Sequence, residues 1–507
     1  MNRPEAEPHH RHDEGAEDAC LTSVPSPPTY RLSDSGRPLM AAPLTRLVRK
    51  SLAVTLAGLM AVPVSMPLPV AAQSRGPMII RDQEIENLLR DYANPILGVA
   101  GVRKSGFQIV LVQDRGFNAF VADGRRMFIN TGALMDAKTP NEIIGVIAHE
   151  TGHIAGGHLQ RLREQMATAQ ILAMAGMLLG AGAAIGTARS PQVGNSGVGA
   201  MGIGLGAQDM AMRSLLSYQR GEEQAADRSA LKYLDATQQS PKGLLETFQR
   251  FNQEAMFKTT GVDPYLVSHP FPQERISNLE TTAKKSPYWD KKDPPALQAR
   301  HDLMRAKLFG FTARADEVGR RYPLSDNSAP ARYARAIAAY RNKQLGPALA
   351  GIDSLTREQP NNPYFWELKG QVLLEFGRAN EAVTALRRSV SLAPNSGMIK
   401  GMLGQALVAT GTPANVDAAI GELSNAAMRE PESSDIWRHL ATAYSRKGQE
   451  GQAHLAAAQA YFFEGDYSAA ATQANRAKQL LPPNSPGWLK AEDILNYRPP
   501  RSAQRNN

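Results

Sequence analysis

Residues 141–163 read NEIIGVIAHETGHIAGGHLQRLR and follow a Thr-Pro pair, which is typical of the start of a helix. Wound at about 100° per residue, this helix gathers its isoleucines on one face and places His149 and His153 together on another, with Glu150 beside them. The spacing is H-E-x-x-H, in which two histidines on one turn bind zinc and the glutamate acts as a general base. We therefore predict a metal site on this helix. The alternative is an amphipathic helix whose two histidines face solvent.

Zinc needs at least one further protein ligand, and His158 is a candidate in the same stretch. Its distance from His149 is one residue short of the spacing in metzincin proteases. On a straight helix its side chain projects onto the apolar face, so we expect core packing to cover it. Gly156 and Gly157 offer the alternative, because a break there would free His158 from that face.

A second predicted helix, RGEEQAADRSALKYLDA at residues 220–236, offers a carboxylate ligand. Glu223 projects close to the middle of its apolar face, whereas Glu222 falls at the margin. A carboxylate aimed into a protein core needs a cation or a metal to be tolerated, so Glu223 is the better candidate for the third ligand. Asp227 lies on the adjacent face and is suited to orient a ligand histidine.

The two motifs together, H-E-x-x-H and the E-x-x-A-D of residues 223–227, resemble the gluzincin family of HtpX and the CAAX-prenyl proteases, metallopeptidase family forty-eight. The resemblance covers residues 75–279. It implies an α+β, mainly helical protease that holds one zinc ion per chain. The roles it implies are metal ligation by His149, His153 and Glu223, catalytic base for Glu150, and support of the ligands for Asp227.

Two further stretches resemble this family. Residues 117–132 look like its edge-strand region, which implies that Asn118, Ala119 and Phe120 bind the substrate backbone by strand addition. The Ser-His-Pro sequence around His269 is similar to that of the repeat-bearing, BepA-type members. That likeness implies that His269 can act as a fourth zinc ligand and hold the enzyme latent; the alternative is a loop histidine without a metal contact.

The N-terminal part of the chain predicts export. Residues 1–39 are polar and rich in Pro and Ser, and we interpret them as a disordered extension or the result of a misassigned start. Residues 40–72 combine basic residues, an apolar run and a final Val-Ala-Ala, which together indicate a Sec-type signal peptide. Its removal would take away Cys20, the single cysteine, and would leave a chain suited to the oxidising periplasm. A disulfide scaffold and a Cys-ligated metal site are thereby excluded.

Charge distribution argues against a nucleic-acid partner. The net charge is +9, but no run of five Lys or Arg residues occurs anywhere in the 507 residues.

Between the two zinc motifs, residues 165–208 are nearly uncharged, apolar and rich in glycine. We expect this segment to be a lid over the site or a peripheral contact with a membrane. Membrane spans like those of HtpX are the alternative.

The C-terminal half repeats. Pro360 and Pro394 are separated by 34 residues, the period of tetratricopeptide repeats, and small and aromatic residues recur between them at the positions this repeat uses. We predict four or five units in residues 295–497, forming an all-α superhelix that binds proteins and performs no chemistry. A generic helical domain is the alternative.

The combined prediction is a zinc metalloprotease domain at residues 73–290 followed by the repeat superhelix. By resemblance to BepA-type proteins, its substrates would be misfolded or unassembled outer-membrane proteins in the periplasm, with the outer-membrane assembly machinery as a further partner. Two alternatives stay open: a largely latent protease that acts as an assembly chaperone, and a membrane-embedded protease of the HtpX kind.

Overall fold

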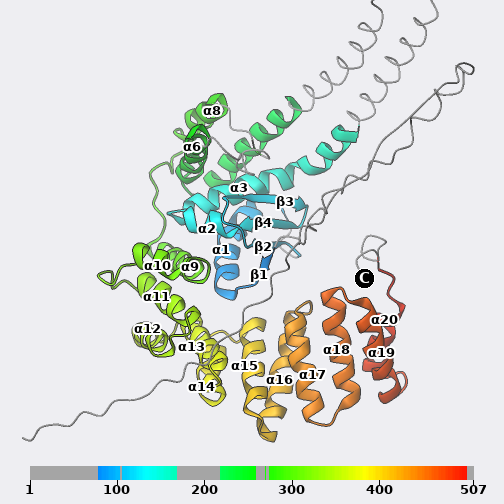
Figure 1. Cartoon of the computed structure of the whole chain (residues 1–507). Helices are drawn as coiled ribbons and strands as arrows, with labels where there is room; N and C mark the ends of the chain where they lie inside the picture. Colours follow the sequence, from blue (N-terminus) through cyan, green and yellow to red (C-terminus); the bar gives the residue numbers. More distant parts are fainter. Residues whose placement is uncertain (1–77, 103–105, 168–216, 258–268, 270–272, 500–507) are drawn as a thin grey trace, which may run out of the picture. The chain divides into compact units, whose positions relative to one another are not determined.

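A computed structural model describes residues 78–102, 106–167, 217–257, 269 and 273–499 (Figure 1). The predicted extension and signal peptide lie outside these residues, and so does most of the predicted glycine-rich segment, from residue 168 onward. No helix in the described part of the chain is long and apolar enough to cross a lipid bilayer.

The N-terminal region is built on a small mixed sheet. Its four strands follow the order β1-β2-β4-β3, where β2 and β4 run parallel and the outer pairings are antiparallel. Their bounds are β1 Ile79–Ile80, β2 Gln108–Val112, β3 Ala119–Asp123 and β4 Arg126–Asn130. Because β3 is last in this order, it forms an edge of the sheet. Phe120 on β3 pairs with Phe128 on β4, and their rings stack with centroids 5.0 Å apart.

Helices cover this sheet and enclose the first hydrophobic core (Figure 1). They are α1 Gln83–Val99, α2 Thr131–Asp136, α3 Pro140–Gly156, α6 Lys242–Phe257, α8 Gln273–Ala283, and the helical residues 158–167 and 217–236. The Asp82 side chain caps α1 by accepting a hydrogen bond from the Ile85 N–H at 3.0 Å.

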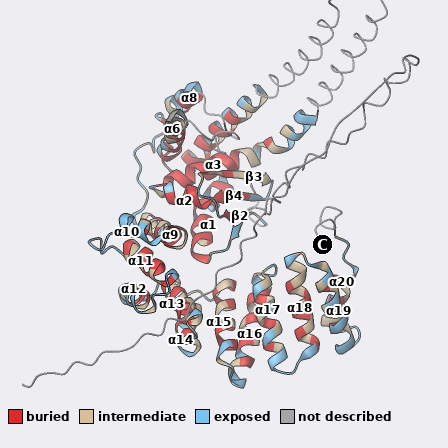
Figure 2. Ribbon diagram, in the orientation of Figure 1, coloured by how far each residue is buried: buried red, intermediate tan, exposed pale blue. Residues whose placement is uncertain are grey.

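Helix α3 is the central element of this region and packs against α1, α6 and β3. It begins at Pro140, where the missing N–H costs no helical hydrogen bond, and residues 140–152 are buried (Figure 2). Gly145 lets the backbone of α6 approach closely, since a Cβ there would lie 2.7 Å from the Cβ of Leu244. The helix ends at Gly156, and Gly157 adopts a left-handed conformation with φ 67°.

The C-terminal half consists of consecutive helices that pack against their neighbours in sequence (Figure 1). Their bounds are α9 Pro295–Thr312, α10 Ala315–Arg321, α11 Ala329–Arg341, α12 Leu345–Glu358, α13 Pro363–Glu375, α14 Ala379–Leu392, α15 Gly397–Thr410, α16 Pro413–Arg429, α17 Ser434–Arg446, α18 Glu450–Glu464, α19 Tyr467–Leu480 and α20 Pro486–Asn496. The predicted fold class, a mainly helical protease domain followed by helical repeats, is confirmed.

Equivalent contacts recur along these repeats. The indole N–H of Trp366 donates to the carbonyl of Pro360 at 2.9 Å, and that of Trp437 donates to Pro431 at 2.7 Å. Gly370 lies against Leu386 in the same way that Gly404 lies against Leu423: a Cβ on either glycine would overlap the leucine side chain. The predicted small positions are therefore the points where paired helices cross most closely.

Helix α1 and Arg81, which precedes it, also contact the repeats. The Asn87 amide donates to the Tyr364 hydroxyl at 2.9 Å, the Ser396 hydroxyl donates to Gln83 at 2.8 Å, and Arg81 and Glu430 pair at 2.7 Å. Helix α9 belongs to the first core as well, since Met304 and Leu308 pack there. The N-terminal region and the repeats thus share buried and polar contacts.

Candidate metal centre

Four side chains from three parts of the chain meet beside α3. His149 and His153 come from α3, Glu223 from the helical residues 217–236, and His269 from a separate segment. Each offers one ligand atom, and these atoms all lie within 4.8 Å of one another. The two histidine Nε2 atoms are 3.1 Å apart, and each is 3.4 Å from an oxygen of Glu223. Periodicity predicted that His149 and His153 lie together, and the family resemblance predicted Glu223 as the third ligand and His269 as a candidate fourth. The structure brings all four together.

The chemistry of this donor set fits a zinc ion. Two imidazole nitrogens that face each other at 3.1 Å, next to a carboxylate, form a compact N/N/O set of the kind that binds zinc in proteases. Most of this set is removed from bulk water: the side chains of His149 and Glu223 are 0% and 7% exposed, and that of His153 is 14% exposed. Burying such a set is tolerable when a cation compensates it. The cluster could therefore hold a metal ion, with His149, His153, Glu223 and His269 as its ligands.

Charged neighbours hold the ligands in place. The Nδ1 of His149 lies 3.0 Å from an Asp227 oxygen, so its other nitrogen, Nε2, is left to face the cluster. Arg275 pairs with Asp227 through two nitrogens, at 2.6 and 2.8 Å, and with Glu223 through a third, at 2.8 Å. Asp227 therefore lies where the resemblance predicted it. Arg275 had no predicted role, because nothing in its local sequence indicates contacts with residues 48 and 52 positions earlier.

These contacts shift the protonation equilibria of the site. Burial lowers the pKa of His149, but its hydrogen bonds to Asp227 and Glu223 outweigh burial and raise that pKa to about 9. Burial raises the pKa of Glu223, but the positive charges of His269 and His149 outweigh burial and lower it well below its usual range. Glu223 is therefore held as a carboxylate, the form that ligates metal.

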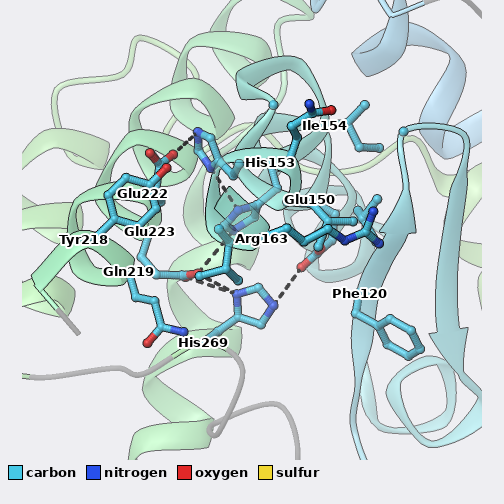
Figure 3. Close-up of a pocket in the computed structure, with 17 residues that line it drawn as sticks. Phe120, Glu150, His153, Ile154, Arg163, Tyr218, Gln219, Glu222, Glu223 and His269 are labelled. Atoms are coloured by element: carbon cyan, nitrogen blue, oxygen red, sulfur yellow. Dashed lines mark hydrogen bonds and ion pairs between the residues drawn. The ribbon is translucent and has the colours of Figure 1, made fainter. Parts of the chain in front are cut away.

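Glu150 lies in the same pocket but outside the ligand set. Its carboxylate is 1% exposed, and one of its oxygens lies 3.5 Å from the Nε2 of His269 (Figure 3). Burial raises the pKa of Glu150, against the opposing effect of the charges on His269 and His149. A carboxylate with a raised pKa beside a metal cluster is suited to accept and return a proton.

A cavity of about 370 Å³ opens in front of these residues. Apolar and polar side chains from β3, α3 and the two helical segments around it contribute to its wall, among them Phe120, Val121, Ile154, Leu159, Leu162 and Tyr218. Figure 3 shows Phe120 on its strand across the pocket from His269. The three predicted edge-strand residues therefore lie in different surroundings. Phe120 lines the cavity, Ala119 is fully buried in the core, and Asn118 directly precedes β3.

The expectation for His158 needs correction. Its side chain is buried, at 6% exposed, but it does not pack onto the apolar face of α3. It contacts His153 at 3.0 Å and Glu222 at 2.7 Å and lines the cavity. The straight-helix projection is wrong because α3 ends at Gly156 and the left-handed Gly157 turns the chain. The paired glycines are the sequence signal for this break.

Comparison with known proteins agrees with the geometry. Residues 80–283 match the family described as peptidase family M48. The chain carries an M48 peptidase domain. With the ligand cluster and Glu150 in this peptidase domain, the chain is a metalloprotease. Residues 349–460 match the family described as the cytochrome c-type biogenesis protein H TPR domain, so the predicted tetratricopeptide repeats are confirmed as well.

Three relatives match more than half of the chain each. The beta-barrel assembly-enhancing protease of Yersinia pestis is 24% identical over 395 residues, which are 76% of this chain and 78% of that protein. Its counterpart in Escherichia coli K12 is 22% identical over 400 residues, 76% of this chain and 77% of the relative. A putative beta-barrel assembly-enhancing protease of Vibrio cholerae is 26% identical over 301 residues, 57% of this chain and 58% of the relative.

Solved structures are similar to parts of the chain. The crystal structure of MamA covers 32% of this chain and 90% of its own, at 19% identity and a TM-score of 0.26. The TPR protein YrrB, which is described as having an unusual peptide-binding site, covers 46% of this chain and 100% of its own, at 16% identity and a TM-score of 0.26.

Proposed function

We propose that this metalloprotease is a zinc endopeptidase of the periplasm that acts on misfolded or unassembled outer-membrane proteins. The observation that carries the proposal is the set of His149, His153 and Glu223 around one point, with Glu150 beside it and an open cavity in front. The substrate class rests on the relatives, which are named for enhancing beta-barrel assembly. The location rests on the signal peptide predicted at residues 40–72.

The metal would be held by His149, His153 and Glu223. Bound zinc would polarise the scissile carbonyl and acidify a water molecule. Asp227 orients His149, and Arg275 pairs with the carboxylates of Asp227 and Glu223. Together they hold the ligands in position. Glu150 removes a proton from the attacking water and later delivers it to the leaving amine. Its burial supports this role, because an apolar surrounding brings the pKa of a carboxyl closer to neutrality.

The substrate backbone would bind at β3. This strand is the edge of the sheet, and Phe120 on it lines the cavity, so an extended peptide paired to β3 would pass in front of Glu150. Side chains of the peptide that point toward the cavity would meet Val121, Ile154 and the aromatic ring of Phe120. An endopeptidase with this edge should prefer extended, unfolded segments, as an unassembled membrane protein provides.

His269 supports a second candidate function, in which the protease is mostly latent and the repeats act as an assembly scaffold. Its Nδ1 lies 3.0 Å from Glu223, within the ligand set, and its Nε2 faces Glu150. A fourth protein ligand would close the position that water and substrate need. Activation would then require His269 to leave, and a partner bound to the repeats could favour that state.

A purified chain of residues 73–507 tests the proposal. Incubation with unfolded outer-membrane protein, and with casein as a general substrate, should give cleavage that a chelator abolishes and added zinc restores. Cleavage that persists after complete metal removal would contradict the zinc mechanism. Metal-dependent cleavage of casein alone, with outer-membrane proteins untouched, would contradict only the proposed substrate class.

A further inference from the structure

The end of helix α3 brings His158 beside the predicted metal ligands. Helix α3 ends at Gly156, and the left-handed Gly157 turns the following residues back toward His153. The His158 ring then lies directly against Gly156, where any Cβ would overlap its Nε2 atom. Both glycines are therefore required for this position, one for its backbone conformation and the other for its lack of a side chain.

The contacts of His158 form a chain that ends on a predicted zinc ligand. Its Nδ1 lies 3.0 Å from the Nδ1 of His153, and its Nε2 lies 2.7 Å from an oxygen of Glu222. Glu222 is held in turn by Arg161, whose Nη2 lies 2.9 Å from the same carboxylate oxygen. His158 thus links a solvent-side ion pair to the half-buried ligand His153.

The hydrogen-bonding roles along this chain are fixed by the metal ligand. When the Nε2 of His153 faces the metal, its proton is on Nδ1, which must donate. The Nδ1 of His158 must then accept, and its own proton is on Nε2, where it donates to Glu222. A single tautomer of each ring satisfies every contact. Asp227 makes the corresponding contact with the Nδ1 of His149, at 3.0 Å.

We propose that His158, held by Glu222, is the positioning residue for the zinc ligand His153. The proposal rests on the proposed function in that it takes His153 to bind zinc. Removing the acceptor on Nδ1 would leave the His153 ring free to rotate and would weaken it as a ligand. An imidazole at this position supports His153 without placing a second carboxylate against it beside Glu223, which lies 3.4 Å away.

Zinc affinity measured by competition with a coloured chelator tests this role in the full exported chain. His158→Ala should raise the Kd for zinc by about 10–100-fold, the range expected when a partner of a ligand histidine is lost. His158→Gln keeps one acceptor and one donor and should recover most of that affinity. Leu159→Ala is the matched control, because it removes a neighbouring side chain of the same helix that has no contact with His153 in the described structure, and it should leave the Kd unchanged.

Cobalt substitution supplies a second readout that packing alone would not change. The visible absorption bands of bound Co²⁺ report ligand geometry, so they should shift in His158→Ala and keep their wild-type form in Leu159→Ala. Glu222→Gln should move zinc affinity in the same direction as His158→Ala by a smaller factor, because an amide oxygen still accepts from His158. If His158→Ala does not fold, His158→Gln and Glu222→Gln carry the test.

Wild-type zinc affinity and cobalt bands in His158→Ala would overturn the proposal. Equal weakening in His158→Ala, His158→Gln and Leu159→Ala would also overturn it, since the effect would then be one of packing. His153→Ala separates this failure from that of the proposed metal site. If His153→Ala still binds zinc normally, the site itself is wrong; if it loses zinc while His158→Ala does not, only the positioning role is wrong.

Discussion

The guanidinium of Arg275 makes a two-point ion pair with the carboxylate of Asp227, with N···O distances of 2.6 and 2.8 Å, and both side chains are at least 90% buried. Its remaining nitrogen reaches Glu223 at 2.8 Å. One guanidinium therefore pairs with two buried carboxylates beside the predicted metal ligands. The pKa of Asp227 reflects this: burial raises it, but the hydrogen bonds of Arg275 and His149 outweigh burial and lower it.

Replacing Arg275 should destabilise the peptidase domain. Arg275→Met would leave the Asp227 and Glu223 carboxylates without their cation, and breaking a buried pair in this way costs about 3–5 kcal/mol. Arg275→Lys should restore part of this, because lysine lacks the planar two-point geometry. Chemical unfolding followed by circular dichroism measures the loss. Arg300→Met, which breaks an exposed pair with Asp91, should cost under about 1 kcal/mol; similar losses in both variants would refute the role given to Arg275.

Glu150→Gln should separate metal binding from catalysis. Glu150 lies outside the ligand set, so zinc content by atomic absorption should equal that of the wild type. Peptide hydrolysis should fall by about 10²–10⁴-fold, because glutamine cannot accept the proton of water. Glu246→Gln, on the exposed side of α6, should change neither quantity. Activity retained in Glu150→Gln would assign the general base to another residue.

His269→Ala should raise the basal cleavage of a short peptide while zinc content stays constant. The reason is that His269 occupies a place in the ligand set and lies 3.5 Å from Glu150, where water and substrate would otherwise enter. Kinetics on a fluorogenic peptide measure the effect, and Asn252→Ala on α6 is a nearby control with an exposed side-chain contact. If turnover disappears with zinc still bound, His269 takes part in catalysis and the latent state is the wrong interpretation.

Two glycine-to-alanine substitutions in the repeats should change stability in opposite directions. Gly370→Ala places a Cβ into Leu386 at a helix crossing and should destabilise by about 1–3 kcal/mol through overpacking. Gly421→Ala adds a Cβ in open space on α16 and should stabilise by up to about 1 kcal/mol through helix propensity. Unfolding midpoints in denaturant compare the two. A neutral Gly370→Ala would mean that the helix pair adjusts its distance freely.

The stability of the repeats should depend on pH through Glu367. Burial raises the pKa of Glu367 from 4.5 to about 7, against the charge of Lys307 and with the help of Asp82 and Glu84. Its Oε2 forms no hydrogen bond within the described part of the chain. Between these two pH values the folded protein binds more protons than the unfolded chain, so this group lowers stability as pH rises from about 4.5 to 7.

Glu367→Gln should therefore reduce the loss of stability on going from pH 5 to pH 8. The difference should be about 1–3 kcal/mol, which corresponds to a shift of this size in one carboxyl group. Unfolding midpoints recorded across this pH range measure it. Glu432→Gln, an exposed carboxyl of the repeats, should leave the profile unchanged. Parallel profiles for Glu367→Gln and the wild type would show that the pKa of Glu367 is the same in the folded and unfolded states.

Helical periodicity explains which residues of this site could be predicted from the sequence. His149, His153 and Glu223 project from regular helices, and for such residues the sequence fixes which side chains share a face. The position of His158 could not be predicted in this way. The left-handed conformation of Gly157 ends the helix and changes the direction of the chain, so the side chains that follow no longer continue the helical pattern of α3. The same holds for Arg275, whose partners are distant in sequence. The edge position of β3 was accessible only through the family resemblance, and the order of the four strands was not predicted.

The contacts of α1 with the repeats have a consequence for the order of folding. Asn87, Gln83 and Arg81 find their partners 277, 313 and 349 residues further along the chain. Contacts of such long range form late, because closing a large loop costs entropy before any contact offsets it. The chain enters the folding compartment from its N-terminus, so the contacts of Arg81 and α1 are complete only after residue 430 has also entered it. A chain that ends before that point would leave the polar side chains of Arg81, Gln83 and Asn87 without these partners. That exposed polar surface would distinguish incomplete molecules from complete ones.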